Sequence, residues 1–246
     1  MRLNRTLLLA ATILASTAMP AFAQQEQDKG LLPPGWGDLG ASIGVVSDYR
    51  FRGISQTDEG PALQGSLDWT HDSGVYLGTW ASNVDFTDAD VEVDLYGGYA
   101  FDYGPYNIDV GAIGYFYPGA ADSRDYDFYE GKLAVSRSVG KVNTTAGLNY
   151  SPDYFGGSGD ALYASFGADA PVMDTGFSVQ GHAGYQWIDD ETAFGSPDYA
   201  DWSVGVSYDL YGFDLGLKYT DTNISDRRCN DLCDATAIFT VSRSFN

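Results

Sequence analysis

The stretch WSVGVSYDLYGFDLGLKYT, residues 202–220, alternates apolar and polar side chains on both sides of the dipeptide Tyr211-Gly212. The apolar set is Trp202, Val204, Val206, Tyr208 and Leu210 before the dipeptide, and Phe213, Leu215, Leu217 and Tyr219 after it. The intervening polar set is Ser203, Ser207, Asp209, Asp214, Lys218 and Thr220. Alternation with a period of two predicts strands with one apolar and one polar face, and the short glycine-containing link predicts a tight turn between them.

The same alternation recurs along most of the chain and predicts twelve strands. They lie at residues 39–52, 63–69, 75–86, 91–103, 107–116, 129–136, 142–150, 162–169, 177–187, 202–210, 213–220 and 236–245. In the first of them the polar face carries Asp48, Arg50 and Arg52, and the apolar face includes Tyr49 and Phe51. The pattern leaves the facing of the runs at 75–86 and 162–169 open.

Composition narrows the class of protein. The chain has 246 residues with 13 Lys and Arg against 34 Asp and Glu, a formal net charge of -21. Aromatic residues make up 15% of it, and glycines number 30. The aromatic content excludes an acidic disordered chain, and the charge excludes a basic surface for nucleic acid. The glycines favour strands joined by tight turns over helices.

The links between the strands alternate in length. Short links are expected at 71–74, 103–105, 139–141, 170–176 and 211–212. Longer, mostly acidic links are expected at 53–61, 118–125, 152–160, 189–198 and 221–234, and one member of this second set, near 87–90, is short. Short turns at one rim and long loops at the other are typical of bacterial outer-membrane barrels.

The aromatic residues indicate which face meets lipid. The apolar face at 177–187 runs Phe177, Val179, Ala183, Tyr185 and Trp187, with aromatics toward the strand ends and aliphatic residues between them. Lipid-facing barrel strands show this order, and about 9 to 11 tilted residues span a bilayer, whereas sandwich strands are typically about 5 to 6 residues long. We therefore expect an all-β fold, a 12-stranded antiparallel transmembrane β-barrel of outer-membrane type, with a soluble exported β-sandwich as the rival.

The ends of the chain and its two cysteines indicate an exported protein. Residues 1–23 have two arginines before an apolar run and a small-x-small site, Ala21-Phe22-Ala23, which predicts a cleaved signal peptide. Residues 24–37 then form an N-terminal linker, and residues 38–246 the barrel domain. Cys229 and Cys233 lie close together downstream of this signal, so we expect a local disulfide. After this signal the chain contains no run of about 18 apolar residues, so no membrane-spanning helix is expected.

With the apolar faces outward, the polar faces line an aqueous lumen. The expected pore-lining residues are Asp48, Arg50, Arg52, Asp68, Glu92, Asp94, Asp109, Glu130, Lys132, His182, Asp209, Asp214 and Lys218. Twelve tilted strands give a backbone radius of roughly 12 Å, which suits small solutes. The excess of carboxylates predicts a preference for cations. Alternatively, these charges pair with one another and plug the barrel.

Four segments resemble the TorF family of porins. They are SDYRFRGISQT at 47–57, GPALQG at 60–65, GTWASNVD at 78–85 and the closing VSRSF at 241–245. The resemblance covers most of the mature chain and implies a channel in the outer membrane of a Gram-negative bacterium. It also implies that the C-terminal strand is read by the barrel assembly machinery, although Asn246 follows the terminal aromatic Phe245 here. It implies no catalytic residues.

Passive diffusion of small solutes is therefore the expected function, with outer-membrane lipid and lipopolysaccharide as surroundings and with no cofactor, metal site or nucleic acid. A non-conducting barrel that serves as structural anchor or adhesin is one alternative. An outer-membrane lipid hydrolase is another, because His71, Ser73 and Asn83 faintly resemble a catalytic set. Acidic clusters at 88–94 and 122–127 leave binding of divalent cations open.

Overall fold

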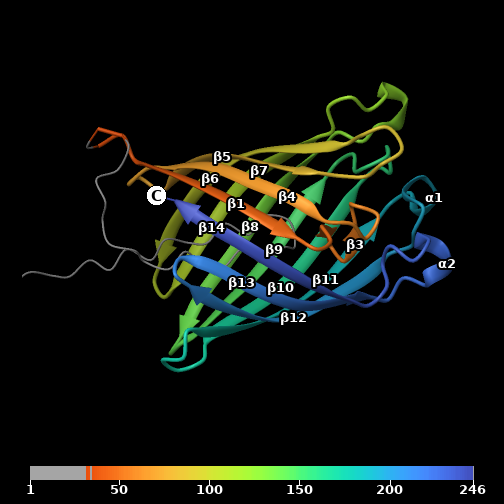
Figure 1. The fold of residues 1–246 in the computed structure, drawn as a ribbon. Helices are drawn as coiled ribbons and strands as arrows, with labels where there is room; N and C mark the ends of the chain where they lie inside the picture. The colour runs from red at the N-terminus through yellow and green to blue at the C-terminus, as the bar shows by residue number, and fades with distance from the viewer. Residues whose placement is uncertain (1–31, 34, 246) are drawn as a thin grey trace, which may run out of the picture.

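The computed structural model describes residues 32, 33 and 35–245. Within them, twelve strands pair antiparallel to their neighbours and close into a barrel (Figure 1). β1 (Asp38–Val46) closes it by pairing with both β4 (Ala62–Thr70) and β14 (Thr236–Phe245). The prediction of a twelve-stranded antiparallel barrel is confirmed. The signal peptide expected at 1–23 and most of the linker expected at 24–37 lie outside the described residues.

The remaining barrel strands follow the chain order, so that each pairs with the strand before and after it. They are β5 (Val75–Asn83), β6 (Val91–Tyr103), β7 (Tyr106–Phe116), β8 (Phe128–Val139), β9 (Val142–Ser151), β10 (Ala161–Pro171), β11 (Phe177–Ile188), β12 (Tyr199–Leu210) and β13 (Phe213–Thr222). Three short helices, η1 (Asp122–Arg124), α1 (Glu191–Phe194) and α2 (Asp226–Cys229), lie in the links. No helix among the described residues is long and apolar enough to cross a membrane.

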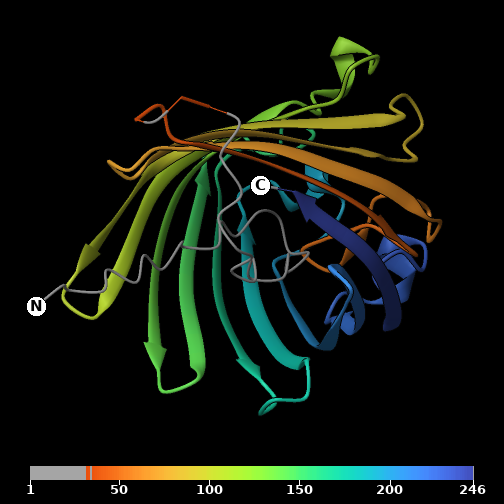
Figure 2. The same ribbon diagram turned by 60° about the vertical axis from the view of Figure 1, so that its left-hand side comes forward.

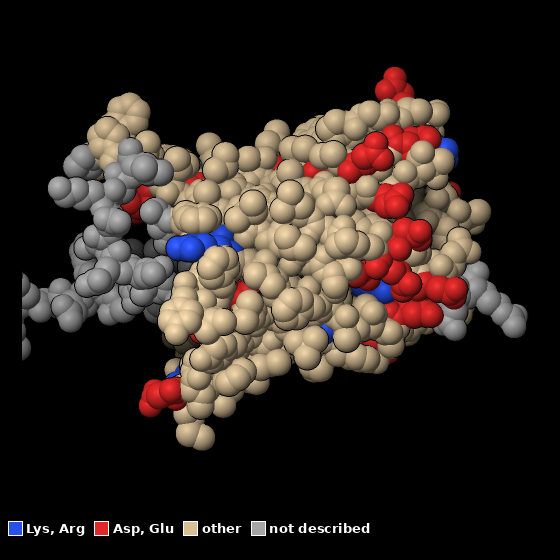
Figure 3. Space-filling view, viewed as in Figure 1, with Lys and Arg blue, Asp and Glu red and all other residues tan. Residues whose placement is uncertain are grey.

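The wall of the barrel has its apolar side outward. Leu95 and Leu217 are each 53% exposed, whereas Glu92 and Asp94 on β6 are almost completely buried. Figure 3 shows the consequence, a wall almost free of charged side chains. The two strands whose facing was open follow the same rule: Leu77 on β5 and Phe166 on β10 point outward and are more than half exposed.

The two rims differ as the link lengths predict. Figures 1 and 2 show tight turns at the rim where the C-terminus lies, and longer links with α1 and α2 at the other rim. Asp and Glu side chains gather at the long-link rim (Figure 3). At the short-turn rim the outward-facing Arg243 lies over the rings of Phe213 and Phe245.

The first strand is shorter than predicted. β1 ends at Val46, and the chain then leaves the wall and returns at β4. Between them a small hairpin, β2 (Arg50–Phe51) with β3 (Ile54–Ser55), forms a separate sheet. The prediction placed Tyr49 on the lipid face, but its side chain is completely buried. The alternation continues past Val46 because β2 is itself extended, and a period of two does not distinguish a wall strand from a hairpin inside the barrel.

Candidate functional site

Residues 47–61, which we call the plug segment, form the center of the candidate site. The β2–β3 hairpin turns through Arg52 and Gly53, whose φ angles are 47° and 84°. Two successive positive φ values in a two-residue link define a tight hairpin turn that suits the strand twist. A Cβ at Gly53 would lie 2.3 Å from Thr222 Cγ2 of β13. The turn is therefore pressed against the barrel wall, and only glycine fits there.

Arg52 at the tip of this hairpin is held inside the barrel. Its Nη2 lies 2.6 Å from Glu130 Oε2 on β8, and its Nη1 donates to Gln186 Oε1 on β11, also at 2.6 Å. The guanidinium carbon lies 4.2 Å from the center of the Tyr163 ring. Burial lowers the pKa of Arg52, but the Glu130 carboxylate and the surrounding tyrosines together outweigh this effect and leave the pKa above its ordinary value. Arg52 thus ties the plug segment to three strands of the wall.

Arg50 is the second buried cation of the plug segment. Its Nε lies 2.6 Å from Asp48 Oδ2, and its Nη1 donates to the backbone carbonyl of Asp234 at 2.7 Å. Glu59 lies 3.3 Å from Nη2 and is exposed. Asp48 also accepts a hydrogen bond from Ser55 at 2.6 Å, which closes the segment on itself. The charges of this segment are thus largely compensated within the barrel.

Tyr49 faces an acidic part of the wall. Its hydroxyl donates to Glu92 Oε1 at 2.8 Å, and its ring packs edge-on against Trp80 with centroids 5.2 Å apart. Burial raises the pKa of Tyr49 well above its ordinary value, so the hydroxyl stays a donor. Among the described residues, the second oxygen of Glu92 and both carboxylate oxygens of Asp94 have no hydrogen-bond partner.

The lumen toward the short turns is more accessible. Lys132 pairs with Asp109 at 2.6 Å, and the Lys132 side chain is 11% exposed. His182, whose side chain is 23% exposed, lies 2.8 Å from the Tyr163 hydroxyl and 3.3 Å from Asp201. By contrast, Arg50 and Arg52 are at most 3% exposed. The plug segment therefore fills the long-link half of the lumen, while the other half retains solvent contact.

The predicted pore-lining residues fall into two groups. Strand alternation and register place ten of them on the inward face of the wall: Asp68, Glu92, Asp94, Asp109, Glu130, Lys132, His182, Asp209, Asp214 and Lys218. Asp48, Arg50 and Arg52 instead belong to the plug segment, which corrects their predicted place on the first wall strand. Sequence reasoning missed Gln186, Tyr163 and Asp201 as partners. Gln186 lies on the predicted polar face of its strand, so alternation alone predicts that it points inward. Its pairing with Arg52, however, depends on the hairpin.

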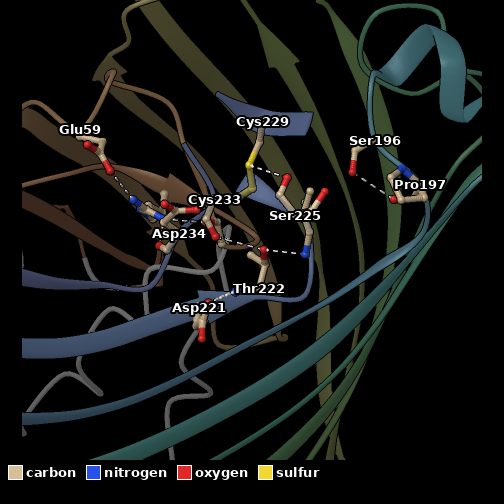
Figure 4. Close-up of a disulfide and its surroundings, with 12 residues drawn as sticks. Glu59, Ser196, Pro197, Asp221, Thr222, Ser225, Cys229, Cys233 and Asp234 are labelled. Carbon is tan, nitrogen blue, oxygen red and sulfur yellow. Dashed lines mark hydrogen bonds and ion pairs between the residues drawn. A yellow bond between two sulfur atoms is a disulfide. The ribbon is translucent and has the colours of Figure 1, made fainter. Parts of the chain in front are cut away.

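A disulfide joins Cys229, the last residue of α2, to Cys233. Cys233 is completely buried, and its backbone carbonyl accepts a hydrogen bond from Thr222 Oγ1 at 3.1 Å. Figure 4 shows Asp234 between the disulfide and Glu59 of the plug segment. The disulfide loop therefore lies against the plug segment at the long-link rim.

The residues suggested for a hydrolase do not assemble. His71 Nδ1 and Ser73 Oγ lie 2.7 Å apart in the exposed turn between β4 and β5. Asn83 is the last residue of β5, at the opposite end of that strand, about 30 Å away at the usual rise per residue. A nucleophile, base and orienting group must lie within hydrogen-bond reach of one another. Within the described residues, no group of three or more His, Cys, Asp or Glu is arranged to hold a metal ion, the acidic clusters at 88–94 and 122–127 included.

Comparison with known proteins agrees with this architecture, a closed barrel of the kind that porins have. A family model described as "Bacterial protein of unknown function (Gcw_chp)" matches residues 34–245, so the chain belongs to this family. No curated protein matches. The resemblance to the TorF family stays a prediction.

Two solved porins share the fold. "KdgM porin" has a TM-score of 0.56 and 6% identity, with 84% of this chain and 98% of that chain covered. "NanC porin structure in rhombohedral crystal form" has a TM-score of 0.56 and 12% identity, with 85% of this chain and 99% of that chain covered. At such low identity the likeness concerns the fold alone.

Proposed function

We propose that this protein is an outer-membrane channel for passive diffusion of small solutes, with a preference for cations. The observation that carries the proposal is the closed barrel with an apolar outer wall and a charged inner wall. An exposed apolar belt requires a lipid surrounding, and closure satisfies the backbone polar groups within it. An aqueous bore is the environment that the inward charges require.

The plug segment sets the size of this channel. It fills the long-link half of the lumen and is fastened by Arg52 to β8 and β11. Solutes therefore pass either beside the segment or when it moves. The fold shared with KdgM and NanC, each named as a porin, supports the channel. The same proposal includes three further steps. The signal peptide at 1–23 directs export across the inner membrane, β14 is recognised during barrel assembly, and the inserted barrel contacts lipopolysaccharide.

The preference for cations rests on unpaired carboxylates in the lumen. Lys132 and Arg52 each have a carboxylate partner. Among the described residues, Asp68 and Asp214 also face inward and form no ion pair. Excess negative charge on a narrow aqueous wall raises the local cation concentration.

Planar-bilayer recording tests the channel. We compare the native chain with a variant in which residues 48–60 are replaced by Asn-Gly. This short link can connect β1 to β4 because Val46 and Ala62 are paired neighbours. The native protein should give small discrete conductance steps, and the shortened variant should give steps several-fold larger, both cation-preferring. The buried ion pairs of the plug segment favour a second function, a non-conducting anchor or adhesin. A shortened variant that is folded and inserted but silent would leave only that second function.

A further inference from the structure

The disulfide loop contacts the plug segment through its backbone. The backbone N–H of Ser55 in β3 donates to the carbonyl of Leu232 at 2.8 Å. Arg50 Nη1 donates to the carbonyl of Asp234 at 2.7 Å. Both acceptors belong to residues 229–234, which we call the clamp segment. Since the acceptors are main-chain oxygens, the path of the clamp backbone decides whether the plug segment has these partners.

The clamp backbone is held in an unusual conformation. Asn230 and Asp231 have φ angles of 50° and 69°, in the left-handed region that non-glycine residues rarely adopt. The disulfide between Cys229 and Cys233 closes the segment around these two residues. Leu232 N–H also donates to the Cys229 carbonyl at 3.0 Å. A short loop keeps two residues in this conformation only when other contacts fix its backbone, and the disulfide provides such a constraint here.

The clamp segment is also anchored to the barrel wall. Thr222 at the end of β13 donates to the Cys233 carbonyl, and the methyl group of the same Thr222 lies against the Gly53 turn of the plug segment. Figure 4 shows Thr222, Cys233 and Asp234 grouped beside the disulfide. The plug segment is thus gripped between the wall and a covalently closed loop, in addition to its attachment through Arg52.

We propose that the disulfide-closed clamp segment positions the plug segment inside the barrel and thereby limits how far the channel opens. The clamp role rests on the contacts above, and its effect on conductance rests on the proposed function. Cys229 and Cys233 are positioning residues in this proposal. Opening the crosslink lets residues 230 and 231 relax, moves both carbonyls, and removes the Asp234 acceptor from buried Arg50.

Trypsin digestion of the folded full-length protein tests the clamp role without reference to conduction. The bonds after Arg50 and Arg52 are buried in the native protein, whereas the Arg124 side chain is 43% exposed and provides an internal reference. Relative to Arg124, cleavage after Arg50 and Arg52 should become at least about tenfold faster in the Cys229→Ser/Cys233→Ser variant, the factor expected for losing a hydrogen bond to a charged group. Native protein treated with dithiothreitol after folding should show the same change. This measurement provides the test even if the double serine variant does not fold.

Two controls make the outcome decisive. Dithiothreitol should not change cleavage of the double serine variant, because that variant has no crosslink to open. Unchanged cleavage after reduction of the native protein overturns the proposal. In planar bilayers, reduction from the long-link side should enlarge the native conductance. If cleavage accelerates while neither the reduced protein nor the variant shortened at 48–60 conducts, the clamp role stands and the proposed channel fails.

Discussion

Arg52 shows how one residue couples a loop to the wall. A left-handed conformation costs an arginine about 1 to 3 kcal/mol, and its guanidinium is removed from water. Glu130, Gln186 and the Tyr163 ring offset both costs. The residue is therefore stable only with the hairpin inside the barrel, and its pair with Glu130 is a tether of the plug segment.

Glu130→Gln should release this tether. The substitution leaves buried Arg52 without its carboxylate, and breaking a buried ion pair from one side costs about 3 to 5 kcal/mol. We expect faster tryptic cleavage after Arg52 and a larger bilayer conductance. The matched control is Glu59→Gln, which removes the exposed partner of Arg50, a pair worth about 0 to 1 kcal/mol. Equal effects of the two variants would contradict the tether.

Gly53→Ala tests the close contact of the turn with β13. The added Cβ would lie 2.3 Å from Thr222 Cγ2, at a positive φ. Gly140→Ala is the control, because Gly140 also has a positive φ, of 66°, but a Cβ there meets no atom within 4 Å. Both variants carry backbone strain, and overpacking adds about 1 to 3 kcal/mol at Gly53 alone. Thermal unfolding should therefore start at a lower temperature for Gly53→Ala, and similar unfolding of both variants would show that the turn has room to shift.

Among the elements, the wall strands were predictable and the plug segment was not. Alternation identifies wall strands because each side chain meets either lipid or the lumen, and the pattern at 202–220 reproduces β12 and β13 closely. The β2–β3 hairpin obeys the same alternation, but its inward turn depends on Glu130, Gln186 and Asp234, which are distant in the sequence. Local patterns contain no information on such partners. The sequence therefore predicted the polar faces of the strands but not the segment that fills the lumen between them.

The disulfide illustrates the same limit. Its pairing followed from two nearby cysteines in an exported chain, but its location beside the plug segment did not. The contacts of Leu232 and Asp234 use backbone carbonyls, which every residue has, so no residue type marks them. The proposed clamp role thus depends on how the plug segment and the clamp segment pack against each other at the long-link rim.

Across the whole molecule, negative charge dominates, which supports the proposed preference for cations. The chain carries 34 Asp and Glu against 13 Lys and Arg, and acidic side chains gather at the long-link rim (Figure 3). Asp68 and Asp214, which form no ion pair within the described part of the chain, extend this field along the inner wall, where the backbone radius is roughly 12 Å. The carboxylates project inward from this backbone, so a solute near the axis lies within about one Debye length of them at 0.1 M salt but not at 1 M, since this length is about 10 Å at 0.1 M and about 3 Å at 1 M.

The reversal potential across a salt gradient should therefore depend on the salt concentration itself. We expect clear cation preference around 0.1 M salt and a much weaker one around 1 M, because screening removes the long-range attraction of the wall carboxylates. Asp68→Asn/Asp214→Asn should reduce the preference at low salt and leave the conductance steps discrete. The Arg52–Glu130 tether is unchanged in this variant, so any loss of selectivity reports charge and not plug movement. A preference for anions at low salt, or selectivity that is the same at both concentrations, would show that the wall carboxylates do not select the permeating ion.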